Sequence, residues 1–122
     1  MVQSGTETHV DTFRRGVELF NTGRFFECHE VWEELWHQER GPDRLFLQAL
    51  IHIAVAFHHQ GLGNRRGAGR QLDKGLRKLA GYLPRYRNMD TERLYRESLA
   101  AREALRLGGP VAWPRLRCTS GS

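Results

Sequence analysis

The segment from residue 25 to residue 37 holds the densest group of side chains that could do chemistry. It reads Phe-Phe-Glu-Cys-His-Glu-Val-Trp-Glu-Glu-Leu-Trp-His. On a helix, His29 and Glu33 are neighbours four residues apart, and Glu30 lies beside them at the edge of an aromatic face. Imidazole and carboxylate groups bind divalent metals in helical proteins and also transfer protons. The segment therefore predicts a polar stripe with metal-binding or acid–base capacity.

A second polar stripe lies on the otherwise apolar segment of residues 43–60, where Gln48 and His52 share one side. Because an unpaired buried polar group costs roughly 1–3 kcal/mol, we expect these side chains to have partners. The acidic groups nearest in the chain are those of the 25–37 segment. The two stripes therefore predict a polar interface between consecutive helices, with Arg44 at its opening.

Two interpretations of this interface remain open. In the first, His29, Glu33 and His52 bind a divalent metal such as Zn, Mn or Fe, and Glu30 is the general base of a metal-dependent hydrolase. In the second, hydrogen bonds of the His–Glu and Glu–Arg type only fix how the two helices pack. The zinc-protease pattern His-Glu-x-x-His is absent, because Glu33 stands four residues after His29.

Charge is unevenly distributed along the chain, whose net charge is +5. Residues 27–39 contain five acidic residues and no Lys or Arg, whereas residues 61–88 contain eight basic residues and one acid, Asp73. The acidic and basic helices could attract each other or serve separate partners. This charge distribution leaves open whether the chain binds a protein partner or associates with itself. Nucleic-acid binding by the basic fourth helix is the weaker prediction, because few aromatic residues accompany it for stacking.

The elements that position these residues are helices separated by short, glycine-marked turns. We expect helices over residues 9–22, 24–38, 43–60 and 64–83, and a fifth from residue 91. No segment alternates with a period of two, so the fold class is all-α: a compact bundle of about five helices built from antiparallel hairpins. Residues 1–107 are predicted to form one helical domain. Residues 108–122 are predicted to form a mobile tail, although Trp113 within it could dock on the helical domain.

Length and composition fit a single globular domain of 122 residues, with 39% hydrophobic and 27% charged residues. No apolar stretch approaches the roughly 18 residues that a membrane span needs, so no membrane partner is expected. The two cysteines exclude a disulfide framework and indicate a reducing, cytoplasmic location.

Three motifs in chain order carry a resemblance to a known family. They are Phe20-Asn21-x-Gly23-x-Phe25-Phe26-Glu27-x-His29-Glu30-x-Trp32-Glu33-x-x-Trp36, Arg44-x-x-Leu47-Gln48-Ala49-Leu50-Ile51, and Gly63-Asn64-x-x-Gly67-Ala68. Over about residues 13–83 the chain resembles domain-of-unknown-function family 309, a family of small bacterial and archaeal proteins. Ala49 departs from the pattern, because the family usually has Gly there.

The resemblance implies an all-α fold whose helical hairpins are similar to tetratricopeptide repeats. It brings no established reaction, although some family members are labelled predicted metal-dependent hydrolases. The motif residues that the resemblance implies for a site are His29, Glu30, Glu33, Arg44, Gln48 and Asn64, the last three as supporting or structural groups. Tetratricopeptide-type hairpins usually bind peptides, so a non-catalytic protein-interaction module is the alternative function.

Overall fold

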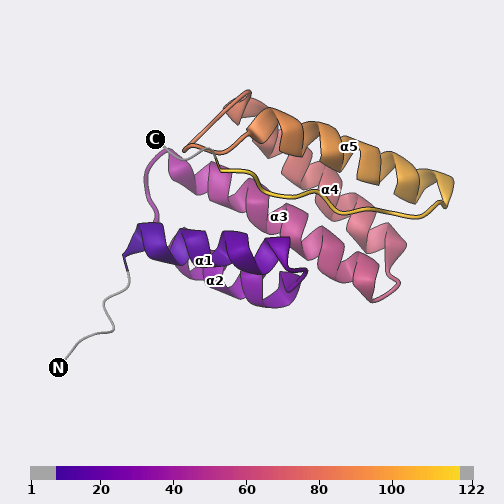
Figure 1. The fold of residues 1–122 in the computed structure, drawn as a ribbon, viewed down its shortest axis with the longest axis horizontal. Coiled ribbons are helices and arrows are strands. Elements are labelled where there is room, and N and C mark those ends of the chain that lie inside the picture. Colours follow the sequence, from indigo (N-terminus) through magenta and orange to yellow (C-terminus); the bar gives the residue numbers. More distant parts are fainter. Residues whose placement is uncertain (1–7, 119–122) are drawn as a thin grey trace.

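The computed structural model describes residues 8–118, and over these residues the protein is all-α with no extended strand (Figure 1). The helices are α1 (His9–Asn21), α2 (Phe25–Gln38), α3 (Asp43–Gly61), α4 (Arg65–Leu79) and α5 (Thr91–Leu107), with a short 3-10 turn, η1 (Ala80–Tyr82), after α4. The predicted fold class is confirmed. Within the described part, no helix has the length and apolar character that a membrane span requires.

Local signals in the sequence determine where the helices begin and where the chain reverses. The side chains of Thr8, Asn64 and Asp90 accept backbone N–H groups at the starts of α1, α4 and α5, each at 3.0 Å. Gly23 and Gly63 follow α1 and α3 with φ of +81° and +82°, a backbone conformation that other residues adopt only with strain. The chain can therefore reverse within a few residues, which gives two antiparallel hairpins.

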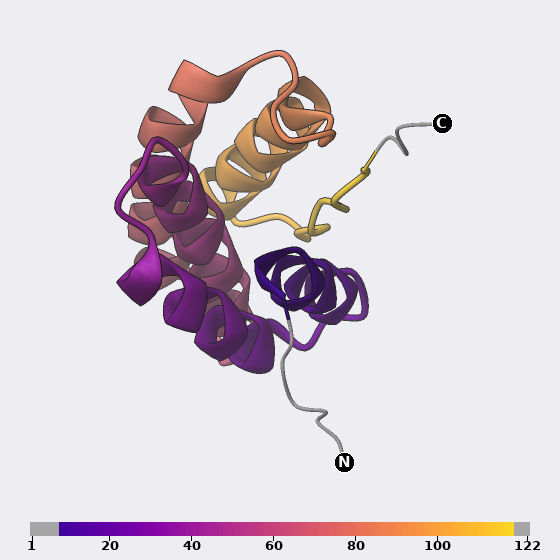
Figure 2. The ribbon, with the colours of Figure 1, turned by 90° about the vertical axis from the view of Figure 1, so that its left-hand side faces the viewer.

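The core is one continuous apolar cluster in which α3 is the central helix, packed against both α2 and α4 (Figures 1 and 2). The helical spacing of apolar residues predicts a core that contains Leu47, Leu50, Ile51, Ala54, Trp32 and Trp36, and the first five of these are buried. Trp36, also predicted to be in the core, is only partly buried. Its ring lies near the C-terminal end of α2, where the guanidinium carbon of Arg44 is 3.9 Å from the ring centroid.

Two glycines allow neighbouring helices to approach closely. A Cβ at Gly16 of α1 would lie 2.1 Å from Nε1 of Trp32 on α2, so α1 can pack at this distance only without a side chain there. A Cβ at Gly75 of α4 would lie 2.8 Å from Ile53 and 3.2 Å from the Cβ of His52. Gly75 therefore lets α4 pack closely against α3.

After α5 the chain runs back in an extended conformation between α1 and α5 (Figures 1 and 2). Asn21 donates from Nδ2 to the carbonyl of Leu116 at 3.0 Å and accepts the Leu116 N–H at 2.8 Å. Leu116 is 4% exposed, and the Trp113 ring packs edge-on against Phe25. Residues 108–118 make these long-range contacts, and the mobility of residues 108–122 stays a prediction. Residues 119–122 lie outside the described part.

Candidate functional site

The predicted polar stripe on α2 forms as a pair rather than a larger cluster. Nε2 of His29 lies 3.2 Å from Oε2 of Glu33. Phe26, half of which is exposed, packs beside His29 and against the ring of His58 from α3, with centroids 5.9 and 5.2 Å away. Glu30 is exposed to solvent. The surface at this end of α2 is therefore a mixed aromatic and imidazole patch.

His52 lies against α4, not against α2 as the sequence predicted. Its Nδ1 is 2.7 Å from Oε1 of Gln71. Burial lowers the pKa of His52; the Gln71 hydrogen bond partly opposes this shift, and the positive charges of Lys78, Lys74 and Arg77 add to it. His52 contacts α4 and not α2 because α3 has a helix on each side and Gly75 lets α4 come into contact with His52. Sequence order alone favoured α2 as the partner.

Arg44 and Asn64 have structural partners. Nη1 of Arg44 donates to the carbonyls of Trp36 at 2.6 Å and Glu39 at 2.8 Å, so Arg44 adds side-chain hydrogen bonds to acceptors at the end of α2. Asn64 caps α4, and its Nδ2 lies 3.3 Å from Nδ1 of His59. Gln48 is partly buried on α3. Arg44 therefore joins α2 to α3 through backbone carbonyls.

The residues predicted to bind a metal do not converge on one point. His29 and Glu33 form a pair on α2, whereas His52 is hydrogen-bonded to α4. Across residues 8–118, no three His, Cys, Asp or Glu side chains are arranged to hold a metal ion. The residues present do not fit the predicted Zn, Mn or Fe site in this arrangement. That site stays a prediction, and no reaction step is derived from it.

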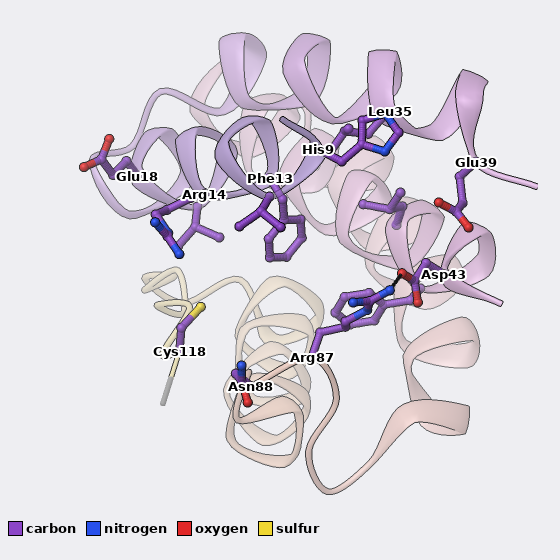
Figure 3. A pocket seen from close by; sticks show the side chains of 14 residues that line it. His9, Phe13, Arg14, Glu18, Leu35, Glu39, Asp43, Arg87, Asn88 and Cys118 are labelled. Atoms are coloured by element: carbon purple, nitrogen blue, oxygen red, sulfur yellow. Dashed lines mark hydrogen bonds and ion pairs between the residues drawn. The ribbon is translucent and has the colours of Figure 1, made fainter. Parts of the chain in front are cut away.

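A hollow of about 670 Å³ lies on another part of the molecule, between α1, the start of α3 and the turn that precedes α5 (Figure 3). We call it the α1 groove. Its floor is apolar and is formed by Phe13, Val17, Leu35, Phe46 and Leu47. Val10, which is 60% exposed, stands at its edge. The sequence did not indicate this groove, because each floor residue has the spacing of an ordinary core position in its own helix.

Charged groups stand at both ends of the α1 groove (Figure 3). At one end, Asp43 accepts hydrogen bonds from Tyr86 and Arg87. Burial raises the pKa of the Asp43 carboxyl. The two hydrogen bonds and the Arg87 charge together lower this pKa by more than burial raises it, so the net pKa is below the usual value. At the other end, Arg14 and Glu18 lie one turn apart near Cys118. Arg14 has no ion pair with a described residue.

These features describe a small all-helical protein built of antiparallel hairpins, with an apolar groove at the side of the bundle. Part of the chain matches a family model. Residues 13–71 match the family described as "Domain of unknown function (DUF309)", which confirms the resemblance over this part of the chain. The matched region runs from α1 into α4 and so includes His29, Arg44, His52 and Asn64.

A curated relative is the "Uncharacterized protein YpuF" of Bacillus subtilis (strain 168). It is 36% identical over 64 residues, which are 52% of this chain and 37% of the relative. The match therefore spans little more than a third of the relative's length. Neither the family description nor the name of this relative assigns a reaction, a ligand or a partner.

Proposed function

We propose that this protein is a non-catalytic protein-interaction module that binds an apolar segment of a partner in the α1 groove. The observation that carries the proposal is the groove itself, whose volume of about 670 Å³ lies within the roughly 300–1,000 Å³ typical of binding sites. Three helices contribute its apolar floor. Burial of one large aliphatic or aromatic side chain there would contribute about 1.5–3 kcal/mol.

The polar groups around the groove favour a peptide segment over a small polar molecule. Small-molecule sites usually contain polar groups that converge on the ligand. In the described part of the chain, the buried side-chain nitrogen and oxygen atoms without a partner belong to Trp36 and Ser98, neither of which lines the groove. Asp43 is already occupied by Tyr86 and Arg87. Apolar burial is therefore the main contribution that this site can make.

The hairpin architecture also supports an interaction role. Stacked helical hairpins, including those of the tetratricopeptide type, usually bind peptides on their inner face. Here the protein's own tail lies between α1 and α5, with Leu116 buried. The α1 groove lies next to the end of this tail at Cys118, and its edge residue Val10 remains exposed to a partner.

Selection from a phage-displayed library of random peptides tests the proposal directly. The groove variant is Val10→Glu, and the matched control is Leu99→Glu on α5, an apolar residue that is 43% exposed and lies outside the groove. We expect enriched peptides to share a large apolar residue and to lose at least about tenfold in affinity for Val10→Glu, about 1.4 kcal/mol. Their affinity for Leu99→Glu should be unchanged.

Two outcomes would contradict the proposal. Peptides that bind Val10→Glu as tightly as the unmodified protein would place the binding site elsewhere. A selection that enriches no common peptide from a diverse library would show that the groove does not recognise such segments. Thermal unfolding of both variants checks that each keeps its fold, since both substitutions lie at exposed positions.

A further inference from the structure

The outer face of α4 carries a regular row of positive charges. Arg66, Arg70, Lys74 and Arg77 occupy one side of the helix, opposite its buried side chains, and all four are exposed. The row extends over twelve residues, from Arg66 to Arg77, or about 16 Å for eleven steps of 1.5 Å. Successive members lie about one helical turn apart, so the charges form a line rather than a compact cluster.

The positive charges on this face are not neutralised within the described part of the protein. Asp73, the acidic residue of α4, is bound by Arg102 of α5. The acidic residues of α2 do not reach α4: Glu27 pairs with Arg24 and Glu33 with His29, and α3 lies between the two helices. No ion pair among residues 8–118 involves the four cations of the row. The sequence left open whether the acidic and basic helices attract each other, and the described contacts include no such attraction.

We propose that this face of α4 binds the phosphate backbone of double-stranded nucleic acid without sequence specificity. A line of cations suits a ligand with a line of anions, and three of the four are Arg, whose guanidinium binds phosphate through two hydrogen bonds. The net charge of +5 would further favour association. This proposal is independent of the α1 groove, which lies against α1 and the start of α3.

Other anionic partners fit the face less well. A helix that binds a membrane surface combines cations with exposed large apolar side chains, but the exposed large apolar residues of the described chain all lie outside α4. A single strand is usually held by base stacking on exposed aromatic rings, and α4 contains no aromatic residue. Contacts to the backbone of a duplex need only the charged groups that are present.

Fluorescence anisotropy with a labelled DNA duplex of about 20 base pairs tests the proposal, measured from about 50 to about 200 mM salt. Each phosphate contact contributes about −0.9 to the slope of log K against log salt, so four contacts predict a slope of about −3.6. Two duplexes of unrelated sequence should bind with equal affinity. An RNA duplex serves as a second probe, because its backbone presents the same phosphates.

The decisive comparison is between two triple variants with the same loss of charge. Arg66→Gln/Arg70→Gln/Arg77→Gln removes three cations of the row, and should weaken binding by at least about tenfold and reduce the slope by about 2.7. Arg14→Gln/Arg85→Gln/Arg96→Gln removes three exposed cations elsewhere and should leave the slope unchanged. Circular dichroism confirms that both variants are folded.

Three results would overturn the proposal. Equal weakening in both triple variants would show a diffuse effect of net charge. Equal affinity for polyglutamate, or for vesicles of phosphatidylcholine and phosphatidylserine, would show that the face does not distinguish a duplex from other anions. Absence of binding to either duplex at about 50 mM salt would remove the proposal altogether.

Discussion

Gly16 determines how closely α1 and α2 pack. The indole of Trp32 lies directly over this glycine, and its Nε1 donates to the carbonyl of Phe13 at 3.3 Å. The position is fully enclosed, since Trp32 has no exposed surface. A side chain of even one carbon would therefore have to displace the largest residue in the core.

We expect Gly16→Ala to lower the free energy of unfolding by about 1–3 kcal/mol, the usual cost of overpacking. Gly69→Ala is the matched control, because a Cβ at that position of α4 would meet nothing within 4 Å. Replacing glycine inside a helix should there raise stability by about 0.5–1 kcal/mol. Urea denaturation measures both changes. A stabilising effect of Gly16→Ala would mean that the Trp32 ring is free to move.

The environment of His52 predicts a pH dependence of stability. Burial, aided by the α4 cations, lowers its pKa in the folded state, so the folded protein favours the neutral imidazole. Its stabilising contribution is complete above the unfolded pKa of about 6.5 and is lost as the pH falls through the lower folded pKa. His52→Gln should flatten this decline in the free energy of unfolding, whereas the exposed His37→Gln should not. An identical acid slope in all three proteins would show that other groups cause the decline.

At the scale of helices, local sequence signals were sufficient to predict the elements but not all of their contacts. The polar cap of Asn64 and the glycine of the first turn act within a few residues of themselves, so spacing alone located the helices. By contrast, Asn21 binds Leu116, 95 residues away in the chain. No local pattern marks such a pair, so spacing along the chain did not predict this contact of the tail.

The candidate site was predictable only in part, for a related reason. The pairing of His29 with Glu33 follows from their spacing on one helix. The partner of His52 depends on which of two flanking helices comes closer, and Gly75 decides this in favour of α4. The α1 groove depends on the placement of three helices and the turn at Arg87, so no single segment contains its signal.

The tail should contribute to stability as a buried element. We expect Leu116→Ala to lower the free energy of unfolding by about 2–5 kcal/mol, the range for buried leucine truncation. Leu107→Ala makes the same chemical change at a side chain that is 68% exposed, and should stay within about 0.5 kcal/mol of the unmodified protein. Chemical denaturation of the two variants measures the difference. Equal effects would show that the packed position of the tail carries little free energy.

At the scale of the whole molecule, the core and the tail connect both hairpins to α5. One apolar cluster extends from Val17 of α1 to Leu105 of α5 and Leu116 of the tail. The N-terminal hairpin therefore shares its buried surface with the rest of the protein and has no separate core. Small single domains of this kind usually unfold in one transition.

Two probes should accordingly report the same thermal midpoint. Tryptophan fluorescence follows α2 and the tail through Trp32, Trp36 and Trp113, whereas far-UV circular dichroism follows all of the helices. Because the cluster is continuous, we expect the two transitions to coincide. A fluorescence midpoint several degrees below the circular dichroism midpoint would show that the first hairpin and the tail separate before the other helices unfold.

The course of the tail also matters for protein engineering. Because it returns along α1, both ends of the described chain reach the α1 groove, which His9 and Cys118 line. A fusion partner joined directly before His9 or directly after Cys118 would thus lie beside the proposed binding site and compete with a ligand for it. An insertion at the exposed turn of Leu62 and Gly63, at the opposite end of a helix about 27 Å long, would leave the groove accessible.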